Sequence, residues 1–310
     1  MRSRVASSMI VNLMGMVSLM GVAAGAQPPE APDGCRAAEG AKASPEGYAN
    51  VIIHEKTGLE LILVPAGQFE MGSGVGLHQV TIGAPFYMGK TEVTNAQFHK
   101  FIEATGYDGN DDRCPDPDVA PDSENDLYLR HWHGKSIMPS GDDHPVVWVN
   151  WKNTKAFCKW AGLALPSESQ WEYACRAGTT TPYYFGEDQD EFAGYGWSNT
   201  SKEFHTHSVA SKLPNDWGLY DMLGNVWEWV EDDYVSDEFI YQHLEVEALL
   251  PFSKPPTDGS ARLADKLTKA LRGGSWHTHE VVCRSSTRYN LGPFNAAADI
   301  GFRVMLPPDN

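Results

Sequence analysis

Apolar residues recur at alternate positions in two adjacent stretches near the start of the chain. These are LELILVPAG, from Leu59 to Gly67, and GQFEMGS, from Gly67 to Ser73. Side chains two apart point to the same face of a strand, so a period of two is typical of half-buried β-structure. The pattern predicts two strands that pair with each other.

Three later stretches have the spacing of amphipathic helices. One starts at Thr94 and runs through NAQFHKFIEAT, the second is Trp151 to Ala161, and the third is Ser167 to Arg176. In the third, Ser167 is the N-cap and Gln170 stands at the third helical position, which is the arrangement of a capping box. The remainder is rich in turns and short segments, so the pattern favours an α+β fold with little regular secondary structure.

The aromatic content indicates that this irregular chain is folded. The 310 residues include 29 Gly and 20 Pro, a content often found in disorder, but also 10 Trp, 12 Tyr and 12 Phe. Aromatic side chains bury large areas even from irregular backbone. We expect one domain over residues 47–310, preceded by a Pro-rich leader over residues 27–46, since no repeat or linker marks a further boundary.

The first 26 residues predict a cleaved export signal. Arg2 and Arg4 form a basic start, an apolar run follows, and the small residues Ala24-Gly25-Ala26 precede Gln27. A membrane anchor is the alternative, but polar residues interrupt the run and no charged stop-transfer segment follows it. We therefore expect a periplasmic protein with no membrane anchoring after cleavage.

The net charge of −17 limits the possible partners. With 41 acidic and 24 basic residues, the chain repels nucleic acid and anionic membrane surfaces, and no basic stripe offsets this. A small molecule or a peptide is the more plausible substrate class.

The stretch GLYDMLGNVWEWVE, from Gly218 to Glu231, is the most distinctive motif. Trp227 and Trp229 flank one carboxylate, Glu228, after a Gly-Asn turn. Further motifs are GKTEVTNAQF (Gly89 to Phe98), HPVVWVNW (His144 to Trp151), LPSESQWEYACRAG (Leu165 to Gly178), LRGGS (Leu271 to Ser275) and IGFRVM (Ile300 to Met305). From about Leu61 to Met305 the set resembles the formylglycine-generating enzyme family, also called the sulfatase-modifying or PvdO-type family. The resemblance implies a C-type-lectin-like α+β fold, often with bound calcium.

The calcium ligands implied by the resemblance fall within the same motif. They are the side chains of Asp221 and Glu228 and the carbonyls of Gly224 and Val226. Hard oxygen ligands from a tight loop suit Ca²⁺. A buried carboxylate that accepts backbone N–H bonds is the alternative for Glu228.

The segment after RGGS differs from the pattern of the family's founding activity, which oxidises a substrate cysteine to formylglycine with a copper-binding cysteine pair. The pair positions fall on Thr278 and Glu280, and Cys283 is the one cysteine of the segment. Two thiolates are what hold Cu(I) in a soft site. The resemblance instead implies a structural disulfide between Cys175 and Cys283, with a nucleophilic Cys283 as the alternative.

The same segment supplies the candidate catalytic residues. Glu280 replaces a catalytic cysteine and is a candidate base if burial raises its pKa, with His277 and His279 as flanking imidazoles. Ser275 and Trp227 match pocket positions of the family, and Trp276 adjoins them. We expect these three to contact substrate.

Three His-x-His pairs offer places for a redox metal that the sequence leaves unidentified. They are His131 and His133, His205 and His207, and His277 and His279. Residues two apart on extended backbone point to one side, so each pair can present two imidazoles to one metal or substrate.

Three functions follow from the resemblance and the departures from it. The first is a PvdO-type exported enzyme that performs a two-electron oxidation in the maturation of a peptide siderophore, such as one with a pyoverdine-like chromophore. The second is a formylglycine-generating sulfatase-modifying oxidase. The third is a non-catalytic lectin-like binding or envelope-complex subunit. The loss of the cysteine pair together with the export signal favours the first.

Overall fold

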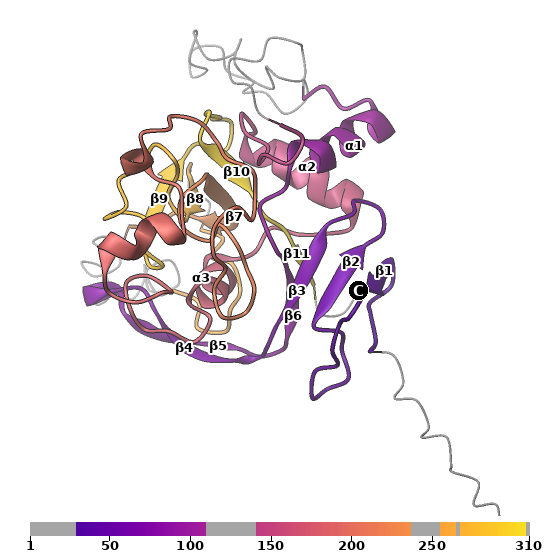
Figure 1. Cartoon of the computed structure of the whole chain (residues 1–310), viewed down its shortest axis with the longest axis horizontal. Helices are drawn as coiled ribbons and strands as arrows, with labels where there is room; N and C mark the ends of the chain where they lie inside the picture. The colour runs from indigo at the N-terminus through magenta and orange to yellow at the C-terminus, as the bar shows by residue number, and fades with distance from the viewer. Residues whose placement is uncertain (1–28, 110–140, 237–254, 265–266, 308–310) are drawn as a thin grey trace, which may run out of the picture.

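The computed structural model of the chain describes residues 29–109, 141–236, 255–264 and 267–307 (Figure 1). The predicted export signal, Cys114, and the His131 and His133 pair lie outside these ranges. Among the described helices, none is long and apolar enough to cross a bilayer.

The first sheet has five antiparallel strands in the order β1-β2-β3-β6-β11. The strand β11 pairs with β6, so segments far apart in the sequence lie side by side (Figure 1). The strands are β1 (Cys35–Ala37), β2 (Val51–His54), β3 (Glu60–Val64), β6 (Phe86–Gly89) and β11 (Met305–Leu306).

The second sheet has four strands in the order β10-β7-β8-β9 and holds the WEW motif. Its strands are β7 (Trp227–Asp233), β8 (Lys269–Arg272), β9 (Arg288–Leu291) and β10 (Ile300–Phe302). The pair β7-β10 is parallel and places Gly301 opposite Glu228, while Arg272 of β8 lies opposite Glu228 on the other side. A Cβ on Gly301 would lie 2.6 Å from the carbonyl oxygen of Val146, so this register requires glycine.

The two strands predicted near residue 67 both form, but they do not pair with each other. Strand β3 pairs with β2 and β6, whereas β4 (Gly67–Met71) pairs with β5 (His78–Ile82) across the short 3₁₀ helix η1 (Gly74–Gly76). The connection between β3 and β4 is Pro65-Ala66. A two-residue hairpin turn needs positive φ, which proline cannot adopt, and the chain therefore passes into a separate ribbon.

The three predicted helices are confirmed as α1 (Asn95–Thr105), α2 (Trp151–Ala161) and α3 (Glu168–Arg176). Each begins with a capping box, at the N-caps Thr94, Asn150 and Ser167. Two further 3₁₀ helices, η3 (Gln189–Gly194) and η4 (Asn199–Ser201), follow α3. Local capping chemistry thus fixes where the helices start.

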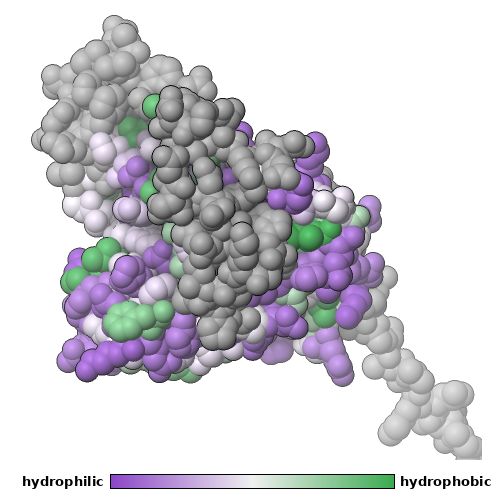
Figure 2. Space-filling view, turned by 90° about the horizontal axis from the view of Figure 1, so that it is seen from above, coloured by the Kyte–Doolittle hydropathy of each residue, from purple (hydrophilic) through white to green (hydrophobic). Residues whose placement is uncertain are grey.

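Aromatic side chains fill the core, and two indole N–H groups donate hydrogen bonds to carbonyls of the backbone around it. Phe98 of α1 stacks on Phe157 of α2, with ring centroids 5.6 Å apart. The indole of Trp229 is fully buried and donates to the carbonyl of Val149 at 3.0 Å. Trp151 donates in the same way to Val230 at 2.9 Å. The part of the face in Figure 2 that is not grey is mainly hydrophilic, with small separate apolar patches.

Candidate functional site

Glu228 is fully buried, and an arginine neutralises it. Arg303 donates from Nη2 to Oε1 and from Nε to Oε2, both at 2.6 Å. Trp171 of α3 donates its indole N–H to Oε2 at 2.7 Å. Arg303 also donates to the carbonyls of Gly89 and Tyr220, which satisfies most of its N–H groups. Side-chain donors therefore occupy both oxygens of Glu228.

Asp221 and Glu92 are buried carboxylates that each keep one oxygen without a hydrogen-bond partner. Oδ2 of Asp221 accepts from the Ala210 amide at 2.7 Å, and Oε1 of Glu92 accepts from Asn225 at 3.1 Å. Oδ1 of Asp221 and Oε2 of Glu92 remain unpaired. Burial raises the pKa of Asp221 to about 6, and burial reinforced by the charge of Asp221 raises the pKa of Glu92 well above its usual range. A bound cation or a proton would reduce the repulsion between these two carboxylates.

The residues predicted to hold calcium fit that ion in part. Asp221 offers a free oxygen, whereas the side chain of Glu228 is held by Arg303. Glu92, which the motif-based prediction missed, offers a second free carboxylate oxygen. Carboxylates of this kind are hard ligands that suit Ca²⁺. The calcium site stays a prediction and is centred on Asp221.

The turn between Asp221 and Glu228 joins the WEW motif to the RGGS segment. Gly224 has φ of +84°, and a Cβ there would lie 2.2 Å from the carbonyl oxygen of Trp197. The Gly224 amide donates to Gly273 at 3.0 Å, and the Asn225 amide donates to Trp197 at 2.9 Å. Val226 is fully buried directly after this turn.

Ser275 is fully buried and organises the turn that carries the candidate catalytic residues. Its hydroxyl donates to Asp299 at 2.8 Å and lies 2.9 Å from the hydroxyl of Thr278. The same oxygen accepts the His277 amide at 3.2 Å. With its hydroxyl engaged in this way, Ser275 supports the segment from inside.

The two tryptophans predicted to contact substrate are largely buried. Trp227 lies in the core with its ring 5.3 Å from that of Tyr289, which is partly exposed. The Trp276 amide donates to the carbonyl of Asn225 at 2.8 Å, and its indole stacks on His277 at 5.2 Å. Each tryptophan can offer solvent only a small part of its ring.

Glu280 is held by hydrogen bonds that keep it ionised. Gln189 donates to Oε1 at 3.2 Å, and the Ser198 hydroxyl donates to Oε2 at 3.4 Å. Burial raises the pKa of Glu280, but hydrogen bonds, with Thr200 foremost, outweigh burial and leave the pKa below its ordinary value. The condition set for Glu280 as a base, that burial raise its pKa toward the working pH, is therefore not met. Glu280 is a positioned carboxylate but a weaker base than predicted.

The two candidate imidazoles take different positions. His279 Nδ1 lies 3.6 Å from Oε2 of Glu280, so these two side chains are neighbours. His277 instead stacks on Trp276. Both imidazoles are exposed to solvent. The structure thus brings together Glu280 and His279 from the predicted catalytic set.

The predicted disulfide between Cys175 and Cys283 is not formed, and both residues are free buried thiols. The Cys175 thiol faces the carbonyl of Met222 at 3.9 Å, while the Cys283 thiol faces the carbonyl of His279 at 3.7 Å. Each thiol thus contacts a backbone carbonyl of its own. Burial raises the pKa of each to about 12, which makes them poor nucleophiles.

A surface hollow of about 550 Å³ lies elsewhere, beside the first sheet, and none of the predicted site residues lines it. Its lining is Asp33, Gly34, His54, Glu55, Lys56, Ala161, Gly162 and Leu306. The candidate catalytic segment is thus separate from this hollow.

Comparison with known families decides the relationship. The sulfatase-modifying factor enzyme 1-like domain matches residues 50–307. The chain belongs to this family. A formylglycine-generating enzyme of Streptomyces coelicolor is 30% identical over 294 residues, which cover 80% of this chain and 89% of that protein.

Solved structures of similar proteins confirm the α+β fold of this sulfatase-modifying family member. The structure of PvdO from Pseudomonas aeruginosa matches with a TM-score of 0.64 and 29% identity, over 82% of this chain and 97% of that chain. Treponema denticola variable protein 1 matches with a TM-score of 0.59 over 81% of this chain and 95% of its own, and its 21% identity shows the fold alone.

The donor set of this family member does not fit a copper centre of the two-thiolate kind. The segment from Arg272 to Arg288 has Cys283 as its single cysteine, and that thiol is buried with a pKa raised to about 12. Thr278 and Glu280 offer oxygen atoms, which are hard donors and do not suit Cu(I).

Proposed function

We propose that the protein is an exported oxidoreductase of the PvdO type, which performs a two-electron oxidation during maturation of a peptide siderophore in the periplasm. Its substrate would be a small aromatic or peptide precursor, such as a pyoverdine-like chromophore in its dihydro form. Similarity to the structure of PvdO at 29% identity supports this proposal. The observation that carries it is the positioned Glu280 carboxylate in the segment where the cysteine pair is missing.

Glu280 would accept the proton that leaves the substrate. Its hydrogen bonds to Gln189 and Ser198 fix the carboxylate, and a positioned base typically contributes about 10²- to 10⁴-fold to a rate. Exposed His279, 3.6 Å away, would pass the proton to solvent. The substrate loses two protons and two electrons, and molecular oxygen would take both pairs to give hydrogen peroxide.

Formylglycine formation is the second candidate, because formylglycine-generating enzymes are about 30% identical to this chain. That reaction would need Cys283 as nucleophile. The buried Cys283 thiol, with its pKa raised to about 12 and no second cysteine in its segment, disfavours it. A non-catalytic binding subunit is the third, and the structural hydrogen bonds of Ser275 are compatible with that role.

Metabolite mass spectrometry of a deletion strain tests the proposal. The strain should accumulate a siderophore precursor heavier than the product by two hydrogens, and the wild-type gene should restore the product. Glu280→Gln keeps the shape of the side chain but removes its basicity, so it should fail to restore the product although its thermal stability is nearly unchanged. Cys283→Ser is the matched control and should restore it.

Other outcomes would exclude this function. Full conversion by Glu280→Gln would remove that carboxylate from the mechanism. Unchanged siderophores together with a loss of sulfatase activation in the deletion strain would favour formylglycine formation. If neither changes, the binding-subunit role is supported.

A further inference from the structure

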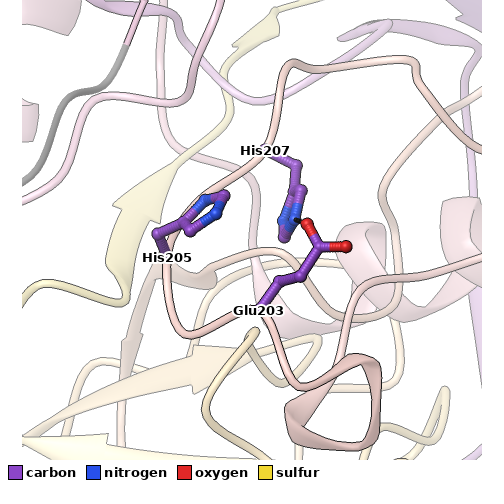
Figure 3. Close-up of side chains that lie close together, drawn as sticks. All are labelled: Glu203, His205 and His207. Atoms are coloured by element: carbon purple, nitrogen blue, oxygen red, sulfur yellow. Dashed lines mark hydrogen bonds and ion pairs between the residues drawn. The ribbon is translucent and has the colours of Figure 1, made fainter.

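A second cluster of chemistry-bearing side chains lies outside the catalytic segment, on the loop that follows η4. Glu203, His205 and His207 lie close together there, and each offers one potential ligand atom within 4.8 Å of the other two (Figure 3). Two imidazoles and one carboxylate form a donor set typical of zinc and of non-haem iron sites with an open position. We propose that these three residues bind a divalent first-row transition metal, with Zn²⁺ as the best match.

His207 is a rigid ligand. Its ring stacks on Trp197 with centroids 3.6 Å apart and planes 4° from parallel, and its amide donates to Oδ1 of Asn225 at 3.0 Å. Nε2 lies 2.8 Å from a Glu203 oxygen, while Nδ1 is buried without a hydrogen-bond partner. The polar contact of this ring is therefore directed entirely at Glu203.

His205 has the second interaction that metal-binding histidines usually have. Its Nδ1 lies 2.7 Å from the carbonyl oxygen of Thr206. An N–H at that position leaves the lone pair on Nε2 for a metal and fixes the tautomer. The rings of His205 and His207 lie 4.6 Å apart, so both can approach one ion.

Lys212 brings a positive charge near the cluster, but other groups engage its ammonium. It lies 3.6 Å from the centroid of the Trp197 ring and donates to the carbonyl of Ala193 at 2.6 Å. The Lys212 ammonium therefore does not occupy the cluster. Because the protein supplies three ligands, a four-coordinate metal would have one position open to a water or a substrate atom.

The cluster adjoins the candidate catalytic segment through shared residues. Asn225 accepts the His207 amide with its side chain and the Trp276 amide with its carbonyl. In η4 and just before it, the Asn199 amide donates to Thr278, and Ser198 donates to Glu280. A metal at this loop would lie next to the same surface, although the inference rests on the cluster alone and not on the proposed oxidation.

Metal titration of the purified protein tests the site. After chelator treatment and dialysis, the protein should bind one equivalent of Zn²⁺ by calorimetry, and Co²⁺ should give visible absorption bands of a low-coordinate site. His205→Ala and Glu203→Gln each remove a direct ligand, so each should weaken Zn²⁺ binding by at least the roughly 10- to 100-fold that loss of an outer-shell partner costs. Both side chains are exposed, so the variants should keep the thermal stability of the wild type.

Two controls separate this site from others. The double variant His277→Ala/His279→Ala removes a His-x-His pair elsewhere and should bind Zn²⁺ like the wild type. Excess Ca²⁺ should not displace Zn²⁺, because a hard ion gains little from imidazole. Wild-type affinity in His205→Ala, loss of binding in the double control, or binding only at millimolar Zn²⁺ would each overturn the proposal.

Discussion

Glu228 and Arg303 form a bidentate ion pair in the interior, with both donor–acceptor distances at 2.6 Å. Glu228 belongs to the WEW motif of β7, and Arg303 follows β10, the strand that pairs with it in parallel. The WEW motif and the IGFRVM motif, which both carry the resemblance to the family, therefore each supply one partner of this ion pair. Its strength is open to direct measurement.

Arg303→Met should destabilise the fold strongly, since it leaves the Glu228 carboxylate buried without its countercharge. We expect a loss of about 3–5 kcal/mol in the free energy of unfolding, measured with urea. Lys90→Met is the matched control, because the Lys90–Glu60 pair is exposed and should contribute at most about 1 kcal/mol. Equal stabilities for the two variants would contradict the assignment.

Stability without calcium should fall as pH rises from 3.8 to about 6. The pKa of Asp221 is raised from 3.8 to about 6 in the folded protein. The folded state therefore binds the proton more tightly, so its stabilising effect is complete below pH 3.8 and is lost as pH rises through 6. The difference amounts to about 3 kcal/mol.

Asp221→Asn isolates this effect in chelator-treated protein. Asparagine keeps an acceptor for the Ala210 amide and does not titrate, so the curve of unfolding free energy against pH should become flatter near pH 6. A residual slope should persist, because burial also raises the pKa of Asp232 to about 7. An identical pH profile for wild type and variant would refute the role of Asp221.

Calcium should raise the melting temperature if it binds at Asp221, because a ligand that binds only the folded state stabilises it. Chelation should lower the melting temperature of the wild type and leave that of Asp221→Asn unchanged. Glu92→Gln should also reduce the sensitivity to chelation. An unaffected wild type would mean that a shared proton, not a cation, balances these carboxylates.

Gly224→Ala and Gly218→Ala compare two glycines of one motif. Both have positive φ, which costs an L-residue roughly 1–2 kcal/mol. At Gly224 the new Cβ would also meet the Trp197 carbonyl at 2.2 Å, whereas Gly218 has nothing within 4 Å. Gly224→Ala should therefore be clearly the less stable of the two in thermal unfolding, and the opposite order would rule out this packing.

Export can be tested on the purified protein. The mature chain should be recovered from the periplasmic fraction and start at Gln27, after the small residues Ala24-Gly25-Ala26. Its intact mass gives the answer directly. A full-length mass in a membrane fraction would contradict the prediction.

The helices could be predicted from sequence because their signals are local. Capping residues such as Thr94 and Ser167 lie next to the turns they satisfy. The partners of β3 and β4 could not be predicted in this way, because β3 pairs with β2 and with the more distant β6, which leaves β4 to pair with β5. Strand pairing depends on long-range packing that periodicity does not encode.

The same reason limits the prediction of the site. The motif contains both Asp221 and Glu228, but nothing near them in sequence indicated Arg303 or Glu92 as partners. For Glu280 the sign of the pKa change depends on donors from distant loops, including Gln189. Burial alone, which a sequence can suggest, gives the opposite sign.

The contacts of Arg303 also bear on the order of folding. It bonds to Gly89, Tyr220 and Glu228, which lie 214, 83 and 75 residues away along the chain. Contacts of such long range close late and slow the search for the native state. Burying the Glu228 carboxylate without its countercharge is costly, so we expect the buried part of this sheet to become stable only once the Arg303 contacts have formed.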